Sequence, residues 1–254
     1  MGGGSNPKPG EASLAIHGVL FLDEMAEFTK KSLDMLRQPL ETGKVTISRT
    51  QATVVYPAHF LLIMNPCPCG YLESTSRYCT CTPKQVQSYR NRVSGPIEGR
   101  NDIVLSLQPV SLHQESRDDV ESSTTIRSSV QEAREKQFER YGKEALNAAI
   151  SIDELLSKVS LTQNQNRFLQ NRSLKQSWSN RVHVKMICLA RTISDIRGGN
   201  EISDEALWEA VTLRKAHSKQ LTGTLEAWVV NLGIGIQIVF ITSSAVEIIE
   251  MNYI

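Results

Sequence analysis

The chain has 254 residues, an ordinary apolar content of 40%, and 28 Lys plus Arg against 27 Asp plus Glu. This length suffices for two compact units, and the balanced charge excludes a protein that binds nucleic acid through bulk charge, while leaving a local basic surface open. Four of the five cysteines are clustered and no charged-then-apolar segment opens the sequence, so we expect a cytoplasmic protein rather than a secreted disulfide framework.

The first nine residues, rich in Gly and Pro, have the composition of a disordered starting tail. Residues 18–23 then predict a buried strand of a parallel sheet, and this strand ends abruptly in Asp23 and Glu24. A strand that ends in Asp-Glu is the form of a Walker B motif, although acidic pairs are also common at strand ends. The Gly-x-x-x-x-Gly-Lys-Ser/Thr loop that cradles the phosphates in such sites is absent from the 254 residues.

The next segment predicts a helix, a hairpin and a second strand. The apolar stripe of the helix consists of Phe28, Leu33, Leu36 and Leu40. Residues 44–56 contain two β-rich runs around a polar turn, which predicts a hairpin with Arg49 near its tip. Residues 60–64 predict a second buried strand, which ends in Asn65. Because ligands of an open α/β sheet bind beyond the carboxyl ends of its strands, the acidic pair and Asn65 would share one edge.

The rest of the chain changes from α/β to helical character. Residues 85–93 predict a helix, residues 103–107 a third strand, and the polar residues 111–125 a linker. Further helices are predicted at residues 126–150, 152–171, 179–197 and 203–217, and Ser203 opens the last of them. The apolar residues 228–249 are long enough to span a bilayer, but internal Asn, Gln and Gly and the lack of flanking basic residues argue against a membrane helix. We expect a buried or irregular strand pair there.

The cysteines form two pairs, Cys67-x-Cys69 and Cys79-x-Cys81, separated by nine residues. Four thiolates in one short loop suit a tetrahedral structural Zn²⁺ site, although Cys-x-Cys is tighter than the usual Cys-x-x-Cys knuckle. Disulfides and free thiols are the alternatives; a reducing compartment argues against the first and the clustering against the second. Cys188 lies on an apolar helical stripe and is expected to be a core residue.

Several segments together resemble the magnesium-chelatase-like AAA+ ATPases. They are Gly-Glu-Ala-Ser-Leu-Ala-Ile-His-Gly-Val-Leu-Phe-Leu-Asp-Glu (10–24), Asn-Pro-Cys-Pro-Cys-Gly (65–70) and Arg-Val-Ser-Gly-Pro-Ile (92–97). The cysteine cluster and Ala-Arg-Thr-Ile-Ser-Asp-Ile (190–196) resemble more narrowly the ComM/YifB branch. The resemblance runs from about residue 2 to about residue 217 and includes residues 2–10, which reverses the interpretation of the start as a tail.

The resemblance implies a hexameric ATP-driven motor that moves DNA, similar to helicases for branch migration in natural transformation. It implies that Asp23 orients the Mg²⁺ shell, that Glu24 orients the attacking water, and that Asn65 is sensor 1. Without the family, Asn65 would be interpreted as a turn residue before Pro66. Arg181 aligns with sensor 2, the lid arginine that contacts the γ-phosphate; alone it would be interpreted as a surface residue.

The resemblance also implies an arginine finger and a DNA contact. Arg92 and Arg100 follow the cysteines, and Arg100 aligns with the finger, although the family segment Gly-Pro-Leu-Leu-Asp-Arg is here Gly-Pro-Ile-Glu-Gly-Arg. The hairpin corresponds to an insertion that in related ring motors projects into the pore, so Arg49, and more weakly Lys44, would contact DNA phosphates. The alternative for each of these side chains is an ordinary solvated charge.

The expected architecture is α/β: a partial AAA+ P-loop NTPase core, a parallel sheet with helices, followed by an all-helical lid domain. Its expected divisions are the core at residues 1–110, a linker at 111–125, the lid at 126–220 and the apolar tail at 221–254. The expected cofactors are ATP and Mg²⁺ in the intact protein and Zn²⁺ in the cysteine loop, and the expected assembly is a homo-hexamer without a membrane. Two other functions stay open: a chelatase-type ATPase subunit, and a non-catalytic zinc-stabilised module that binds DNA or a partner.

Overall fold

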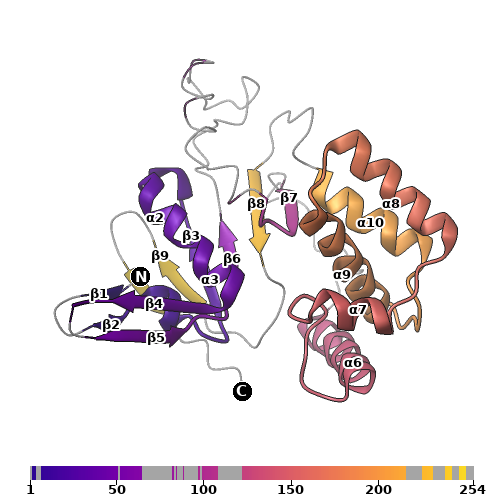
Figure 1. The fold of residues 1–254 in the computed structure, drawn as a ribbon, viewed down its shortest axis with the longest axis horizontal. Helices are drawn as coiled ribbons and strands as arrows, with labels where there is room; N and C mark the ends of the chain where they lie inside the picture. The colour runs from indigo at the N-terminus through magenta and orange to yellow at the C-terminus, as the bar shows by residue number, and fades with distance from the viewer. Residues whose placement is uncertain are drawn as a thin grey trace. The chain divides into compact units, whose positions relative to one another are not determined.

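A computed structural model of the chain describes residues 2–3, 7–50, 52–64, 82, 84, 88, 97, 99–107, 122–215, 225–230, 238–241 and 246–249. The chain divides into two compact units (Figure 1). The sheet unit comprises Met1–Gln108 and Ala216–Ile254, and the helical unit comprises Pro109–Lys215. The predicted change from α/β to helical character is thus present in the structure.

Six strands form the main sheet, in the order β10-β9-β3-β6-β8-β7. Their bounds are β3 Val19–Leu22, β6 Leu61–Met64, β7 Ile103–Leu107, β8 Leu225–Val230, β9 Ile238–Ile241 and β10 Val246–Ile249. β3 and β6 run parallel, with Val19 opposite Leu61 and Leu22 opposite Met64. The prediction of two parallel strands is thus confirmed. Their consecutive apolar residues fit strands that are covered on both faces.

The apolar tail contributes three strands to this sheet. β9 runs parallel to β3 and pairs antiparallel with β10, so the strand pair expected in the tail is present. β8 lies between β6 and β7 and runs antiparallel to both. The sheet is therefore mixed rather than purely parallel. Among the described helices, none combines the length and the apolar content that crossing a membrane requires.

The helical stretch after β3 is interrupted rather than continuous. It consists of η1 (Met25–Glu27), α2 (Lys30–Met35) and α3 (Arg37–Thr42), and the short α1 (Glu11–Leu14) precedes β3. The Thr29 side chain caps α2 by accepting a hydrogen bond from the Ser32 amide at 3.1 Å. Gly43 ends α3 with φ of 64°, and a Cβ atom there would lie 1.8 Å from Cε1 of His59. Only glycine therefore suits this turn into the hairpin.

The predicted hairpin is confirmed as β4 (Lys44–Ser48) and β5 (Thr53–Pro57), paired antiparallel from Lys44 opposite Pro57 to Ser48 opposite Thr53. A second small pair, β1 (Gly2–Gly3) and β2 (Lys8–Pro9), lies near the amino terminus. The Tyr56 hydroxyl of β5 donates a hydrogen bond to the Pro7 carbonyl oxygen at 2.7 Å. The interpretation of the first residues as a disordered tail from composition is thus wrong for the described ones.

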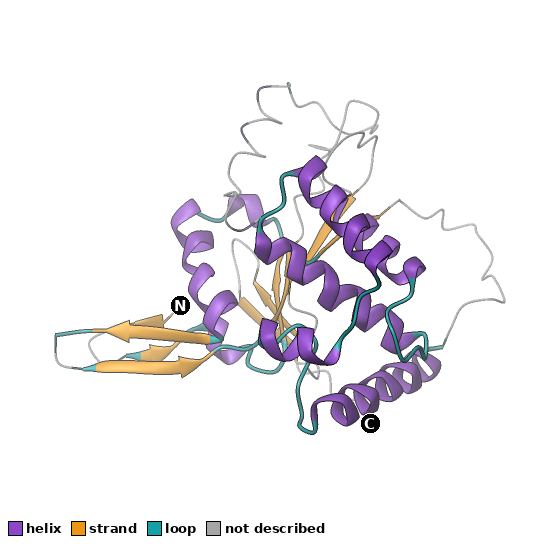
Figure 2. Ribbon diagram, turned by 45° about the vertical axis from the view of Figure 1, so that its right-hand side comes forward, coloured by secondary structure: helices purple, strands orange, loops and turns teal. Residues whose placement is uncertain are grey.

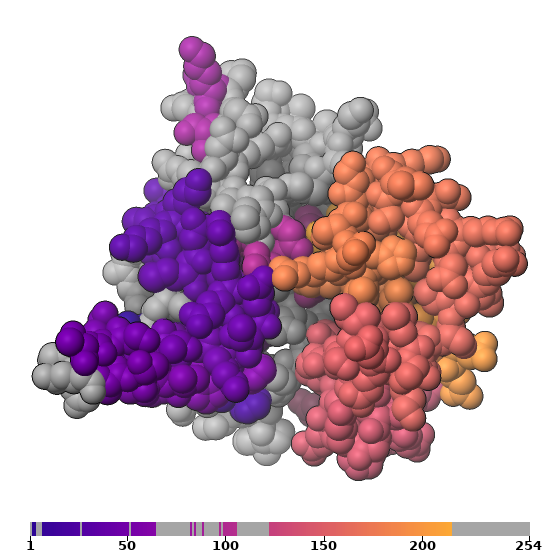
Figure 3. Space-filling view, in the orientation of Figure 1, coloured from indigo at the N-terminus to yellow at the C-terminus, as the bar shows by residue number. Residues whose placement is uncertain are grey.

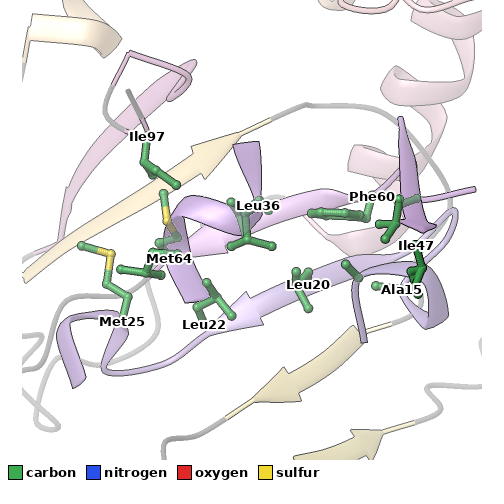
Figure 4. Packing of buried hydrophobic residues seen from close by; sticks show 14 of the residues in the cluster. Ala15, Leu20, Leu22, Met25, Leu36, Ile47, Phe60, Met64 and Ile97 are labelled. Carbon is green, nitrogen blue, oxygen red and sulfur yellow. The ribbon is translucent and has the colours of Figure 1, made fainter. Parts of the chain in front are cut away.

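The core of the sheet unit lies between the β3–β6 pair, the helices and the hairpin (Figure 4). Leu20 and Leu62 are at most 1% exposed, and Figure 4 shows Leu36, at the α2–α3 junction, among the side chains of β3 and β6. Each such leucine contributes about 1.5–3 kcal/mol through burial of its apolar surface. The other labelled members are Ala15, Leu22, Met25, Ile47, Phe60, Met64 and Ile97. This packing fixes the ends of β3 and β6, where the candidate site begins.

The described part of the helical unit contains helices and no strands (Figure 2). The helices are α6 (Ser123–Tyr141), α7 (Ile152–Lys158), α8 (Gln163–Gln176), α9 (Asn180–Ile196) and α10 (Asp204–Lys215). Serine or threonine side chains that accept amide hydrogen bonds precede four of them: Ser122, Ser151, Thr162 and Ser179. Ser203 does the same for α10 by accepting from the Ala206 amide at 3.1 Å, as the sequence predicts.

Two predicted helix boundaries are wrong. The helix predicted at 126–150 begins at Ser123, inside the predicted linker, and ends at Tyr141 because Gly142 adopts a left-handed conformation with φ of 66°. The helix predicted at 152–171 is two helices, because Val159 is extended and Thr162 starts a new capping box with Gln165. The helix predicted at 85–93 lies largely outside the described residues.

Candidate functional site

Asp23 and Glu24 lie directly after β3, at the carboxyl end of the parallel pair. Because Leu22 is opposite Met64, the next residues along the two strands are Asp23 and Asn65. Asn65 itself lies outside the described residues. Asp23 and Glu24 are both half-buried, and the Glu24 amide donates a hydrogen bond to Oδ1 of Asp23 at 3.1 Å. Two carboxylates at this edge provide the oxygen ligands that Mg²⁺ requires, so the donor set fits the expected ion.

The backbone of Glu24 is in the left-handed region, with φ of 49° and ψ of 44°. A residue with a Cβ atom pays about 1–2 kcal/mol for this conformation. The turn is held by the Glu24 carbonyl oxygen, which accepts from the Glu27 amide at 2.8 Å, and by Met25, which is only 1% exposed. Strained backbone that the surrounding packing maintains is frequent at functional sites, so this geometry supports a functional role for the acidic pair.

Arg100, the candidate arginine finger, is buried rather than exposed. Its guanidinium forms an ion pair with Glu41 of α3, and only 9% of the residue is accessible. The Arg100 amide also donates to the Ile97 carbonyl oxygen at 2.9 Å. The structure therefore brings Arg100 together with a residue that the sequence did not single out, 59 positions earlier. Arg92, the other candidate finger, lies outside the described residues.

The two candidate DNA contacts of the hairpin are both exposed, at opposite ends of β4. Lys44 begins the strand, and Arg49 follows its last residue. The Arg49 amide closes the turn by donating to the Ala52 carbonyl oxygen at 2.9 Å. The Arg49 guanidinium lies beside β1: a Cβ atom on Gly3 would be 3.4 Å from its Nη2 atom. The hairpin thus presents a cation near its tip, as predicted.

The remaining predicted site residues are distributed as follows. Arg181 is exposed in the first turn of α9, in the helical unit. The four clustered cysteines lie outside the described residues. Among the residues that are described, no group of three or more His, Cys, Asp or Glu side chains could hold a metal ion. Cys188 lies on α9, forms no disulfide and is half-buried.

A buried polar network in the helical unit was missed by sequence reasoning. Arg140 of α6 and Arg191 of α9 each donate two hydrogen bonds to the carboxylate of Asp195, whose side chain is 0% exposed. Asn147 donates a further bond to this carboxylate at 2.9 Å. Arg191 also donates to the Gly199 and Asn200 carbonyl oxygens. The network joins α6 to α9 and to the turn that follows α9.

The network determines the charge state of its carboxylate. Burial alone would raise the pKa of Asp195, but the hydrogen bonds from Arg140, Arg191 and Asn147 outweigh it, so the pKa is lowered. Burial likewise opposes the charged form of Arg140, yet its bonds to Asp195 raise the Arg140 pKa. Asp195 is thus held ionised between two guanidinium groups, which is the arrangement of a structural ion-pair network.

Comparison with known proteins identifies the class. Residues 1–115 match the family model of magnesium chelatase, subunit ChlI, and residues 120–214 match the model of the ChlI C-terminal region. The chain belongs to this magnesium-chelatase-like family, with an α/β part followed by a helical part.

Its curated relatives lie in the ComM/YifB branch. The chain is 40% identical over 218 residues to a protein named "Uncharacterized protein YifB" of Escherichia coli, and equally to "Competence protein ComM" of Haemophilus influenzae. An uncharacterized protein of Mycobacterium bovis is 37% identical over 144 residues. The first two alignments cover 84% of this chain but 42% of each relative, so the chain spans less than half the length of these proteins.

Proposed function

We propose that this chain carries the water-activating half of an AAA+ ATPase that acts on DNA. The observation that carries the proposal is the acidic pair Asp23-Glu24 at the carboxyl end of β3, beside the parallel strand β6. Membership of the magnesium-chelatase-like family supports the use of ATP and Mg²⁺. The relative named a competence protein supports a role with DNA, because competence is the capacity of a cell to take DNA up.

Each residue has one task in the proposed reaction. Asp23 holds the Mg²⁺ ion, which neutralises charge on the phosphates when it is bound. Glu24 orients and polarises the attacking water, and Asn65 reaches the γ-phosphate from the neighbouring strand. Arg181 is proposed to be the sensor 2 arginine, the role that the family resemblance implies for it. The intact assembly is proposed to be a homo-hexamer that draws DNA past the hairpin, with Lys44 and Arg49 on its phosphates.

The test compares two chains that differ in the phosphate loop. The 254-residue chain should show no Mg²⁺-dependent ATP turnover, because it has no phosphate loop. A chain extended at its amino end by a phosphate-loop segment should turn ATP over, and Glu24→Gln should lower its kcat by two orders of magnitude or more while nucleotide binding persists. Glu27→Gln, three residues further on and exposed, is the matched control and should retain turnover. An extended Glu24→Gln chain that retains its kcat would refute the assignment.

For Arg100 to act as a finger on a neighbouring subunit, its side chain must leave Glu41. The ion pair is largely buried on the Arg100 side, at 11% exposure, and more open on the Glu41 side, at 38%. In the extended hexameric chain, Glu41→Gln should therefore raise kcat if the pair restrains a finger. A purely structural role for the pair predicts a lower melting temperature and unchanged kcat instead. Arg100→Lys further distinguishes an arginine finger from a structural ion pair, because lysine retains the charge but lacks the planar guanidinium group that a finger uses.

The cysteine loop is proposed to hold one structural Zn²⁺ ion in the reducing cytoplasm. Metal analysis of the purified chain should give about one zinc per chain, and Cys69→Ser should abolish it. Cys188→Ser is the matched control, because Cys188 lies on α9, away from the cysteine cluster in the sequence, and this variant should retain zinc. A metal-free wild-type chain, purified without chelators, would exclude the proposed site.

A further inference from the structure

One segment of the helical unit contains basic residues and no acidic ones. Between Glu154 and Asp195 the sequence has no Asp or Glu, although 27 acidic residues are spread over 254 positions. The same segment contains seven cations: Lys158, Arg167, Arg172, Lys175, Arg181, Lys185 and Arg191. Arg191 belongs to the buried network, whereas the exposed members are Lys158, Arg167, Lys175 and Arg181. The overall charge balance of the chain conceals this local excess.

Helix α8 arranges part of this segment into one exposed face. Asn164, Arg167, Asn171 and Lys175 follow one another at intervals of three and four residues, which places them on one side of the helix. All four are exposed, whereas Gln165 and Leu169 of the opposite side are buried. We call these four residues the cationic stripe; α8 belongs to the surface of the helical unit drawn in Figure 3. Its two cations lie about 12 Å apart along the helix axis, at about 1.5 Å per residue.

An aromatic side chain borders the stripe. The Arg172 guanidinium lies over the ring of Phe168, at 5.4 Å from the ring centroid, and both residues are half-buried. Among the described residues, Arg167, Arg172 and Lys175 form no ion pair. The Asp204 carboxylate accepts a hydrogen bond from Gln165, on the buried side of α8, at 2.8 Å. Within the described parts of the chain, no acid therefore forms an ion pair with the two cations of the stripe.

We propose that this face of α8 binds a single strand of nucleic acid. Arg167 and Lys175 would neutralise backbone phosphates, the Asn164 and Asn171 amides would donate hydrogen bonds, and the Phe168–Arg172 pair would stack on an unpaired base. A single strand is favoured over a duplex because an aromatic ring can stack on an unpaired base, whereas the bases of a duplex are already stacked on one another. An anionic membrane surface is disfavoured because the stripe is polar along its length. This inference extends the proposed action on DNA but rests on the stripe alone.

The experiment measures strand binding by the purified 254-residue chain without nucleotide, so ATP hydrolysis does not enter. Fluorescence anisotropy with a labelled oligothymidine strand should show saturable binding. Arg167→Gln/Lys175→Gln should weaken it at least tenfold and should reduce the slope of log K against log salt by about 1.4, at about 0.7 for each phosphate contact. Phe168→Leu keeps an apolar side chain but removes the ring, and should weaken binding roughly tenfold without changing the salt slope.

The matched control is Lys30→Gln/Lys31→Gln, which removes the same charge from two exposed lysines of α2 in the sheet unit. It should bind like the wild type, and circular dichroism should show that all variants are folded. Equal weakening by the two double variants would overturn the proposal in favour of bulk charge. So would absence of binding by the wild type, preference for a duplex of the same sequence, or stronger binding to phosphatidylserine vesicles. Failure of the ATPase test with strand binding intact would refute the proposed function and leave the stripe in place.

Discussion

Replacement of Asp195 by alanine should destabilise the helical unit strongly. The substitution removes the carboxylate that receives hydrogen bonds from Arg140, Arg191 and Asn147. It leaves two guanidinium groups facing each other, one 13% and the other 2% exposed. Breaking a buried ion pair by removing one partner costs about 3–5 kcal/mol, because the remaining charge has lost both its counter-ion and its water.

The structure places this substitution near the lower end of that range. Arg140 is slightly exposed and can turn toward water, and Arg191 retains its bonds to the Gly199 and Asn200 carbonyl oxygens at 2.7 and 2.8 Å. We therefore expect a loss of about 3 kcal/mol, a large share of the 5–15 kcal/mol that stabilises a typical domain. For a unit of about 100 residues this corresponds to a fall in melting temperature on the order of 10–20 °C.

Thermal and urea unfolding should be followed by far-UV circular dichroism and by tryptophan fluorescence, since Trp178 and Trp208 belong to the helical unit. Arg197→Met is the matched control: it breaks the Arg197–Glu209 pair, whose side chains are 51% and 39% exposed, and should cost less than 1 kcal/mol. Equal losses in the two variants would refute the reasoning. Asp195→Leu/Arg191→Met should recover part of the stability, because apolar replacement removes a buried charge together with its partner.

Three further predictions concern single groups. The lowered pKa of Asp195 adds stability that is complete above the ordinary Asp range near pH 4 and is lost as pH falls through the folded-state pKa; acid unfolding of Asp195→Asn should lack this component. Glu24→Gly should raise unfolding free energy by about 1 kcal/mol, because glycine relieves the left-handed strain, yet abolish turnover in the extended chain; a destabilised variant would contradict the strain argument. Gly43→Ala should lower the unfolding free energy by more than about 1 kcal/mol, because the residue is left-handed and the new Cβ atom would meet the His59 ring. An unchanged midpoint of urea unfolding would contradict this prediction.

Features encoded by neighbouring residues were predictable from the sequence. The apolar runs of β3 and β6, the alternating burial of Val45 and Ile47 in the hairpin, and the Ser203 cap all follow from periods of two or from local hydrogen bonding. Helix ends were less predictable. Val159 is apolar and fits a helical stripe, and the break there comes from the stronger capping box that Thr162 forms three residues later.

Contacts between distant residues had no signal in the sequence. The composition of the apolar tail indicates strands but does not specify their partners. The pairing of β8 with β6 and β7 was therefore not predictable. The acidic pair of the site could be found because strand and carboxylates are contiguous, whereas the Glu41 that pairs with Arg100 lies 59 residues before it and the Asp195 that pairs with Arg140 lies 55 residues after it. The family resemblance implies a role for Arg100 on a neighbouring subunit, and the fold gives it a partner within its own chain. Arg100 can have both roles only if the ion pair opens. The strength of the Arg100–Glu41 contact therefore decides whether this residue takes part in hydrolysis or only stabilises the fold.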